Sequence, residues 1–205
     1  MTQARLVAST LDEETARAEV YGLLAALYYA APSDGLHESL RVAVTEAPAA
    51  GALLEGSWSE LVAAARAQSL SGIAREYDAL FGGVGKPELD LFGSHYLSGF
   101  LNEKPLAALR TDIAALGLTC DETMPETEDH VAYVCEVMRY LIAGDDVAVA
   151  NLTRQREFFA RHVQPWLPMM CEAIMNHPKA DFYRALAAFT QTFISVEAQG
   201  FDMLA

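Results

Sequence analysis

Cysteine is scarce in this sequence: its 205 residues include three, at Cys120, Cys135 and Cys171. Their number is odd, and their spacing is too wide for a CxxC redox motif or a zinc site. Cys135 and Cys171 lie in apolar stretches with helical spacing, so we predict that both are small core residues. Such sparing use of cysteine fits a reducing compartment, where disulfides rarely persist.

Positive charge and long hydrophobic runs are scarce as well. Lysine and arginine number 14 against 28 acidic residues, which gives a formal net charge of −14. A field of this sign repels nucleic acid and anionic membranes, so we expect neither as a partner. The first apolar run, residues 20–31, is well short of the roughly 20 residues that span a bilayer. Acidic residues precede it where a signal peptide would be positive, and we therefore predict a cytoplasmic location.

Strand signals are missing, because no segment alternates apolar and polar residues with β-branched enrichment. Helix signals recur instead: Thr10-x-x-Glu13 and Ser57-x-x-Glu60 both match the capping box of a helix start. We predict an all-α protein, a single domain of about eight to ten helices over residues 1–205. The segment 118–125 is typical of a linker and would divide the chain into an N-terminal half, about 10–117, and a C-terminal half, about 126–200.

Glycine, proline and capping residues set the predicted helix boundaries. Pro32 ends a first helix, and Gly117 and Gly144 end two later ones. Further helices are expected over residues 57–80, 104–117, 126–143, 145–163 and 179–199, with a turn at 176–178.

Signatures of catalysis are missing or incomplete. The glycine-rich loop 81–87 lacks the GxxxxGK[ST] spacing of a phosphate-binding loop, and no strand precedes it. No Gly-x-Ser-x-Gly motif supplies a nucleophile. Glu126 and His130 would share a helix face, but the second set of ligands that a metal-binding bundle requires is missing. We therefore predict no catalytic residue, no metal and no bound cofactor.

The segment Glu126-Thr-Glu-Asp-His130 is the most informative part of the chain, because it places three carboxylates and an imidazole before an apolar run. Acidic groups in the first turn of a helix are stabilised by its dipole, whereas an imidazolium there is disfavoured. We therefore predict that His130 is neutral or paired with a neighbouring carboxylate. Aromatic and leucine residues gather near the central loop, where they fill the core or line a groove. An apolar groove with an acidic rim would accept a segment that is hydrophobic along its length and basic at one end.

Four stretches of the chain, in this order, resemble motifs of one family. They are Glu76-Tyr-Asp-Ala-Leu-Phe81, which is similar to Y-x-x-L-F; Phe92-Gly-Ser-His-Tyr-Leu97, similar to W-G-S-x-Y-L; Glu126-Thr-Glu-Asp-His130, similar to E-P-x-D-H; and Phe158-Phe-Ala-Arg-His-Val-Gln-Pro-Trp166, similar to F-x-x-x-H-L-x-x-W. From about residue 12 to residue 200 the chain resembles the TorD/DmsD/NarJ family of redox-enzyme maturation chaperones. Thr127 replaces the family's usual proline, and Phe92 stands where tryptophan is common, which bears on client specificity.

The resemblance implies a cytoplasmic, all-helical chaperone that binds an apo-molybdoenzyme, often through its twin-arginine leader, and holds it for cofactor insertion. A client without a leader, such as a soluble formate dehydrogenase, is equally compatible, and a homodimer is left open. The residues that it assigns to client binding are Leu80, Phe81, Phe92, Gly93, Tyr96, Glu126, Asp129 and His130. We expect Asp129 and His130 on the binding surface rather than in the core. The alternative is a small helical enzyme or nucleotide hydrolase that uses the cluster of Glu126, Asp129 and His130.

Overall fold

The computed structural model describes residues 8–45, 53–82, 86–101, 103–119 and 125–203. These residues form ten α-helices and one π-helical turn, and no strand occurs among them. The elements are α1 (Ala8–Tyr29), α2 (Asp34–Val42), α3 (Glu55–Ala67), α4 (Leu70–Leu80), α5 (Gly93–Ser98), α6 (Lys104–Ala115), α7 (Val131–Ala143), α8 (Leu152–Phe158), the π turn η1 (Phe159–Val163), α9 (Leu167–Met175) and α10 (Phe182–Asp202). The predicted all-α fold is confirmed.

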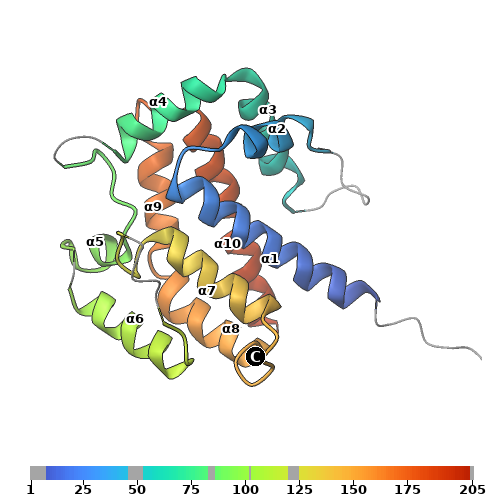
Figure 1. The fold of residues 1–205 in the computed structure, drawn as a ribbon, viewed down its shortest axis with the longest axis vertical. Helices are drawn as coiled ribbons and strands as arrows, with labels where there is room; N and C mark the ends of the chain where they lie inside the picture. The colour runs from blue at the N-terminus through green and yellow to red at the C-terminus, as the bar shows by residue number, and fades with distance from the viewer. Residues whose placement is uncertain (1–7, 46–52, 83–85, 102, 120–124, 204–205) are drawn as a thin grey trace, which may run out of the picture.

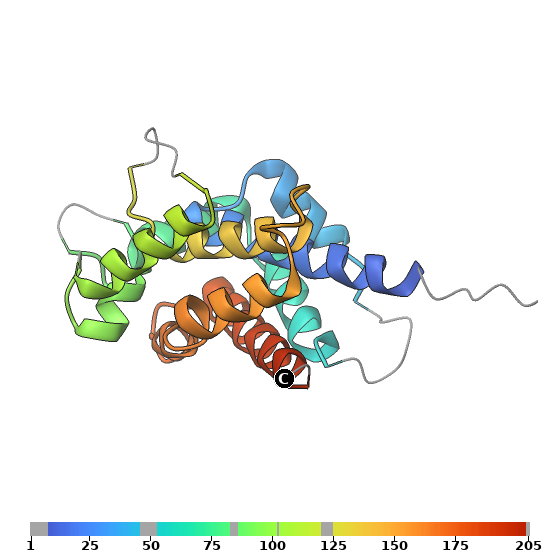
Figure 2. The same ribbon diagram turned by 90° about the horizontal axis from the view of Figure 1, so that it is seen from below.

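The helices pack in two layers around a single core. Helix α1 packs along α7 in one layer, and α10 packs against α9 in the other (Figures 1 and 2). Apolar side chains at helical spacing face the interior from each layer, among them Leu24, Tyr28, Met138, Phe182 and Phe193. Complete burial of one such side chain contributes about 1.5–3 kcal/mol, so this shared core accounts for most of the favourable free energy of folding.

The two predicted halves of the chain share this core. Helix α1 packs on α7 and α3 packs on α10, and each of these pairs joins the two halves. Most of the predicted linker, residues 118–125, lies outside the described residues, so the division into halves remains a prediction. Cys135 and Cys171 are fully buried, as predicted, and burial raises the pKa of both thiols. Cys120 lies outside the described residues.

Local backbone chemistry predicted several helix ends correctly. Helix α6 begins at Lys104 with Pro105 in its first turn, and Gly117 follows it with a φ of 73° that favours glycine. Helix α7 ends at Ala143 with Gly144 as its C-cap.

Several predicted helix starts are wrong. Helices α1 and α3 begin two residues before Thr10 and Ser57, which therefore lie inside these helices. The expected helix over 57–80 is two helices, because Ser69 leaves the helical backbone and its hydroxyl accepts the N–H of Gly72 at the start of α4. Helices α2 and α5 were not predicted.

None of the described helices is both long and apolar enough to cross a bilayer.

Candidate functional site

The motif residues gather where the loop before α5 meets the segment before α7. Phe92 and His130 form an isolated antiparallel bridge, in which the N–H of Gly93 donates to the carbonyl of Asp129 at 2.8 Å and the N–H of Val131 donates to that of Leu91 at 2.9 Å. This pairing holds His130 in an extended conformation. Helix α7 therefore begins at Val131, and the prediction that it begins at Glu126 is wrong.

Asp129 lies inside this junction and binds the start of α5. Its Oδ2 accepts the backbone N–H of Ser94 at 2.9 Å and also the Ser94 hydroxyl. Its Oδ1 accepts the hydroxyl of Thr127 at 2.7 Å. Asp129 is 3% exposed, so the expectation that it lies on an exposed surface is wrong. The carboxylate is held here because the hydrogen bonds compensate for its loss of water.

His130 is also buried, at 4% exposure, and caps α7. Its Nδ1 accepts the N–H of Ala132 at 3.2 Å, which leaves the ring proton on Nε2. Burial lowers the pKa of His130 to about 4, although the neighbouring Asp129 acts in the opposite direction. Of the two expected states of His130, neutral or paired with a carboxylate, the lowered pKa favours the neutral one, and the expectation that His130 lies on a surface rather than in the core is wrong. The ring packs edge-on against Phe92, with centroids 5.0 Å apart, and more distantly against Tyr29.

The first motif stretch, from Glu76 to Phe81, ties α4 to two other helices. The Glu76 carboxylate accepts the backbone N–H groups of Asp181, Phe182 and Tyr183 at 2.8–3.1 Å, which caps the N-terminus of α10. The hydroxyl of Tyr77 donates to the carbonyl of Tyr29 at 2.7 Å, where α1 ends.

The last motif stretch, from Phe158 to Trp166, packs against the start of α5. The Trp166 indole N–H donates to the carbonyl of His162 at 2.6 Å, and its ring lies against Gly93 so closely that a Cβ there would be 3.0 Å from it. Tyr96 stacks on the same indole, with centroids 6.1 Å apart. Three of the motif stretches therefore meet at α5, and the first reaches the cleft beside it through Phe81.

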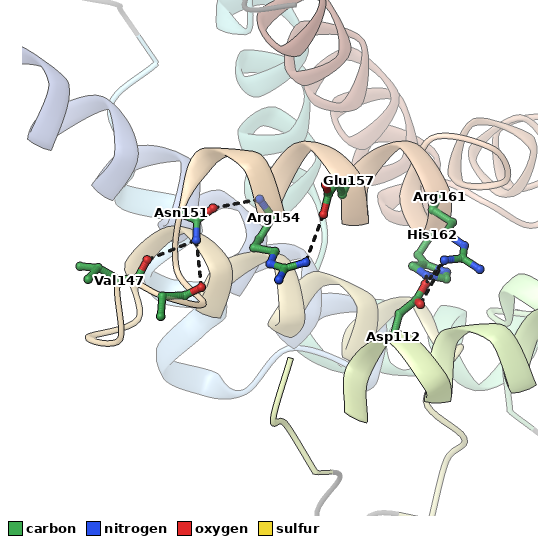
Figure 3. Close-up of polar contacts among 8 residues, drawn as sticks. Asp112, Val147, Asn151, Arg154, Glu157, Arg161 and His162 are labelled. Carbon is green, nitrogen blue, oxygen red and sulfur yellow. Dashed lines mark hydrogen bonds and ion pairs between the residues drawn. The ribbon is translucent and has the colours of Figure 1, made fainter. Parts of the chain in front are cut away.

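An ion-pair cluster joins this last motif stretch, from Phe158 to Trp166, to α6. His162 Nε2 lies 2.6 Å from Asp112 Oδ2, and Arg161 lies 2.8 Å from the same oxygen (Figure 3). Burial lowers the pKa of His162, and the carboxylate of Asp112 opposes this shift. The π turn η1 places both side chains opposite α6, with the N–H of Gln164 bonded to the carbonyl of Phe159.

A small cleft opens beside the junction. It measures about 130 Å³ and includes four predicted residues in its lining, namely Phe81, Phe92, Glu126 and His130. Leu80 and Gly93 are buried, and Tyr96 is half-buried beneath the loop with its hydroxyl bonded to the carbonyl of Asp90. Asp129 does not line the cleft. Some of the predicted residues therefore line the cleft, and the others are buried or half-buried behind its lining.

The residues assigned to client binding did not include six others that line the cleft, namely Tyr29, Tyr77, Pro87, Leu89, Asp90 and Leu91. Tyr29 is the last residue of α1 and is 37% exposed, and the only signal in the sequence was its place just before Pro32. Among the described residues, no three His, Cys, Asp or Glu side chains are grouped to hold a metal ion.

Comparisons with a family model and with known proteins assign the chain to the same family. The family model described as nitrate reductase delta subunit matches residues 47–172. The protein named chaperone protein TorD from Vibrio cholerae serotype O1 is 27% identical over 112 residues, which cover 52% of this chain and 51% of the relative. That from Shewanella loihica is 27% identical over 143 residues, or 64% and 63% of the two chains. The chain thus spans about half of the length of the Vibrio relatives it matches. It belongs to the nitrate reductase delta subunit family, which includes the TorD and NarJ proteins.

Proposed function

We propose that this protein is a cytoplasmic chaperone that binds an apo-molybdoenzyme and holds it until the cofactor is inserted, without catalysing a reaction itself. The observation that carries the proposal is the convergence of three motif stretches on α5 and of the first on the cleft beside it. The names of the relatives agree with it. The client is an oxidoreductase that carries a twin-arginine leader or a soluble formate dehydrogenase without one.

The proposed client-binding region uses the predicted residues in two ways. Phe81, Phe92 and Tyr29 supply aromatic walls that an apolar side chain of the client can contact, and the exposed Glu126 lies at the rim, where it attracts an arginine. Leu80, Gly93, Tyr96 and Asp129 hold these walls in place from the interior, and His130 both lines the cleft and packs against Phe92.

The geometry gives no support to a hydrolase that uses the acidic cluster. Asp129 already accepts hydrogen bonds on both oxygens. The Nδ1 lone pair of His130 is occupied by a backbone N–H, so neither group is free to activate water there. A binding function requires only the shape and charge of the cleft.

Affinity purification from the native cell, followed by mass spectrometry, tests the proposal. Wild-type protein should enrich the catalytic subunit of a molybdoenzyme, and Phe92→Ala should reduce that enrichment because it removes one wall of the cleft. Gly35→Ala is a matched control, since a Cβ at this exposed position of α2 meets no atom within 4 Å. Turnover of a small substrate by the purified protein, with no oxidoreductase enriched, would contradict the proposal.

A further inference from the structure

A cavity of about 380 Å³ lies between α6 and the segment formed by α8 and η1. It shares no lining residue with the cleft beside the motif junction, so it is a separate feature of the surface. Its volume is within the range of about 300–1,000 Å³ usual for ligand-sized sites. Phe158 and Leu116 supply apolar surface inside it, and its polar side chains are drawn in Figure 3: Asp112, Arg154, Glu157, Arg161 and His162.

The segment that carries this cavity is basic, although the protein as a whole is acidic. Residues 147–164 contain Arg154, Arg156 and Arg161 against one acid, Glu157, whereas the whole chain has 14 basic and 28 acidic residues. The side chains of the two arginines that line the cavity, Arg154 and Arg161, are 50% and 61% exposed. A basic surface on an acidic protein complements a partner of negative charge.

Both arginines of the cavity have one edge of the guanidinium available. Arg154 contacts Glu157 through Nη1 at 3.3 Å, and Arg161 contacts Asp112 through Nη1 at 2.8 Å. Within the described part of the chain, neither arginine makes a hydrogen bond through Nε or Nη2. These two nitrogens form an edge that binds a carboxylate through two parallel hydrogen bonds. The cavity therefore presents two groups with the geometry of carboxylate receptors.

The two carboxylates of the lining differ in how firmly they are held. Asp112 is bound by both Arg161 and His162, and burial lowers the pKa of His162, which keeps its imidazole neutral near pH 7. Glu157 is exposed and contacts only Arg154, in an ion pair of the kind that contributes little to stability. A carboxylate of a partner can therefore displace Glu157 from Arg154, and Arg161 can add its two remaining donors while it stays bound to Asp112.

The spacing of the two arginines matches that of side chains on a helix. Arg154 and Arg161 are seven residues apart, which is about two helical turns or about 10 Å. Carboxylates at positions i and i+7 of a partner helix have the same separation. An apolar side chain at i+3 or i+4 of that helix would then face the cavity and could contact Phe158.

An exposed apolar residue extends this surface beyond the cavity. Val147 is 81% exposed, in a turn that Asn151 holds by donating from Nδ2 to the carbonyls of Val147 and Ala148 at 3.2 and 3.1 Å. Figure 3 shows Val147, Arg154 and Arg161 following one another along this segment. A surface that is longer than the cavity favours a helix over a small anion as the partner.

We propose that the cavity between α6 and α8 docks an acidic, amphipathic helix of a second protein. This partner is opposite in charge to the arginine-bearing leader that the family resemblance implies, so it is distinct from the client. The proposal goes beyond the proposed function and does not depend on it.

A labelled peptide tests the proposal. The probe is a synthetic peptide of about 18 residues, five helical turns, with glutamates at i and i+7 and leucines at i+3 and i+4. Its fluorescence anisotropy should show saturable binding to the full chain, and a peptide with glutamines in place of the two glutamates should bind about tenfold more weakly. Absence of saturation up to about 0.5 mM protein, or equal affinity of the two peptides, would overturn the proposal.

Charge variants test where the peptide binds. Arg154→Glu should weaken binding about tenfold, whereas Arg156→Glu, which makes the same change of charge outside the cavity lining, should weaken it less than about threefold. Glu157→Gln should strengthen binding about twofold to threefold, because it removes the carboxylate that competes for Arg154. Equal effects of the two arginine substitutions would mean that attraction is general, and weaker binding by Glu157→Gln would contradict the displacement.

A steric variant tests the cavity without a change of charge. Ala115→Trp places a large ring at the cavity lining and should weaken binding about tenfold. Ala114→Trp is the matched control, because Ala114 is exposed on the same helix and does not line the cavity. Circular dichroism should be that of the wild type for both variants. Equal affinities of the two variants would show that the helix does not enter the cavity.

Two other occupants are separated by competition and by the client. Inorganic phosphate should reduce peptide binding no more than sodium chloride of the same ionic strength, and stronger competition would assign the cavity to a small anion instead. Arg154→Glu should enrich as much molybdoenzyme as wild type, and loss of the molybdoenzyme would show that the client itself occupies the cavity. If the peptide failed to bind, the chaperone function would still stand on its own test with Phe92→Ala.

Discussion

Asp129 Oδ2 accepts hydrogen bonds from both the backbone N–H and the hydroxyl of Ser94, although the two residues are 35 positions apart in the sequence. Both side chains are buried, so water cannot replace a lost bond. The pair fixes the start of α5 against the segment before α7. Phe92 precedes α5 directly, and the position of this cleft wall therefore depends on Asp129.

Asp129→Asn should destabilise the protein by about 1.5–3 kcal/mol, because hydrogen bonds to a buried charged group are lost or reversed. Ser94→Ala should cost less, about 1 kcal/mol, since its backbone N–H keeps the carboxylate as an acceptor. Urea unfolding of both single variants and of the double variant measures the coupling. If the two effects simply added, the residues would not act as a pair.

Gly93→Ala should destabilise the protein by about 1–3 kcal/mol, because the added Cβ would lie 3.0 Å from the ring of Trp166 and force it to move. Thermal unfolding and the near-ultraviolet dichroism of the indole measure this effect. Gly35→Ala is the control and should be neutral or slightly stabilising, since the position is open and helical. Equal effects of the two substitutions would mean that the contact between Gly93 and Trp166 is not tight.

Glu76→Ala should destabilise the protein by about 1–2 kcal/mol, because three N–H groups at the start of α10 lose their acceptor. Hydrogen exchange should show the loss first in the N-terminal turn of α10. Asp78→Ala, which removes an exposed carboxylate from the same helix, should change stability by less than about 0.5 kcal/mol. Protection of α10 that is equal in all three proteins would contradict the capping role.

Much of the fold could be predicted because its signals are local. Pro105, Gly117 and Gly144 act through their own backbone, and each lies at the helix end that it predicts. The capping boxes at Thr10 and Ser57 failed as predictions because a capping box is a weak local preference, and α1 and α3 extend past it. The start of α7 depends on the bridge from His130 to Phe92, which no local pattern contains.

The candidate site was predicted in composition but not in arrangement. The motif resemblance identified residues that the structure brings together, including Phe81, Phe92 and Glu126. It could not show that Asp129 and His130 are buried, because their partners Ser94 and Phe92 are distant in sequence. The same distance separates Glu76 from the helix that it caps.

Acid should destabilise the protein in part through His130. In the unfolded chain a histidine has a pKa of about 6.5, and burial lowers the pKa of His130 to about 4 in the folded state. Between these values the unfolded state binds a proton that the folded state does not. The free energy of unfolding therefore falls as the pH falls, by about 1.4 kcal/mol for each pH unit between about 6.5 and about 4.

His130→Asn isolates this contribution, since asparagine can still cap α7 and does not titrate. Urea unfolding at pH 7.5 and 5.5 should show that the wild type loses about 1.4 kcal/mol more than the variant. The pKa of His162 is lowered as well, so His162→Gln should remove a separate part of the pH dependence of the free energy of unfolding. An identical pH dependence of wild type and His130→Asn would show that the imidazole is not held neutral by burial.

Apolar contact should supply more of the client affinity than charge. Phe92→Ala removes a half-buried aromatic wall of the cleft and should weaken binding of the co-purified oxidoreductase, or of its leader peptide where it has one, by about tenfold or more. Glu126 is exposed, and water and salt screen its attraction for an arginine, so Glu126→Gln should weaken binding only about twofold to fivefold. Calorimetric titration at low and at high salt measures both effects, and only the part due to Glu126 should depend on salt. If Glu126→Gln cost more than Phe92→Ala, or if high salt abolished binding by the wild type, charge rather than apolar burial would hold the client.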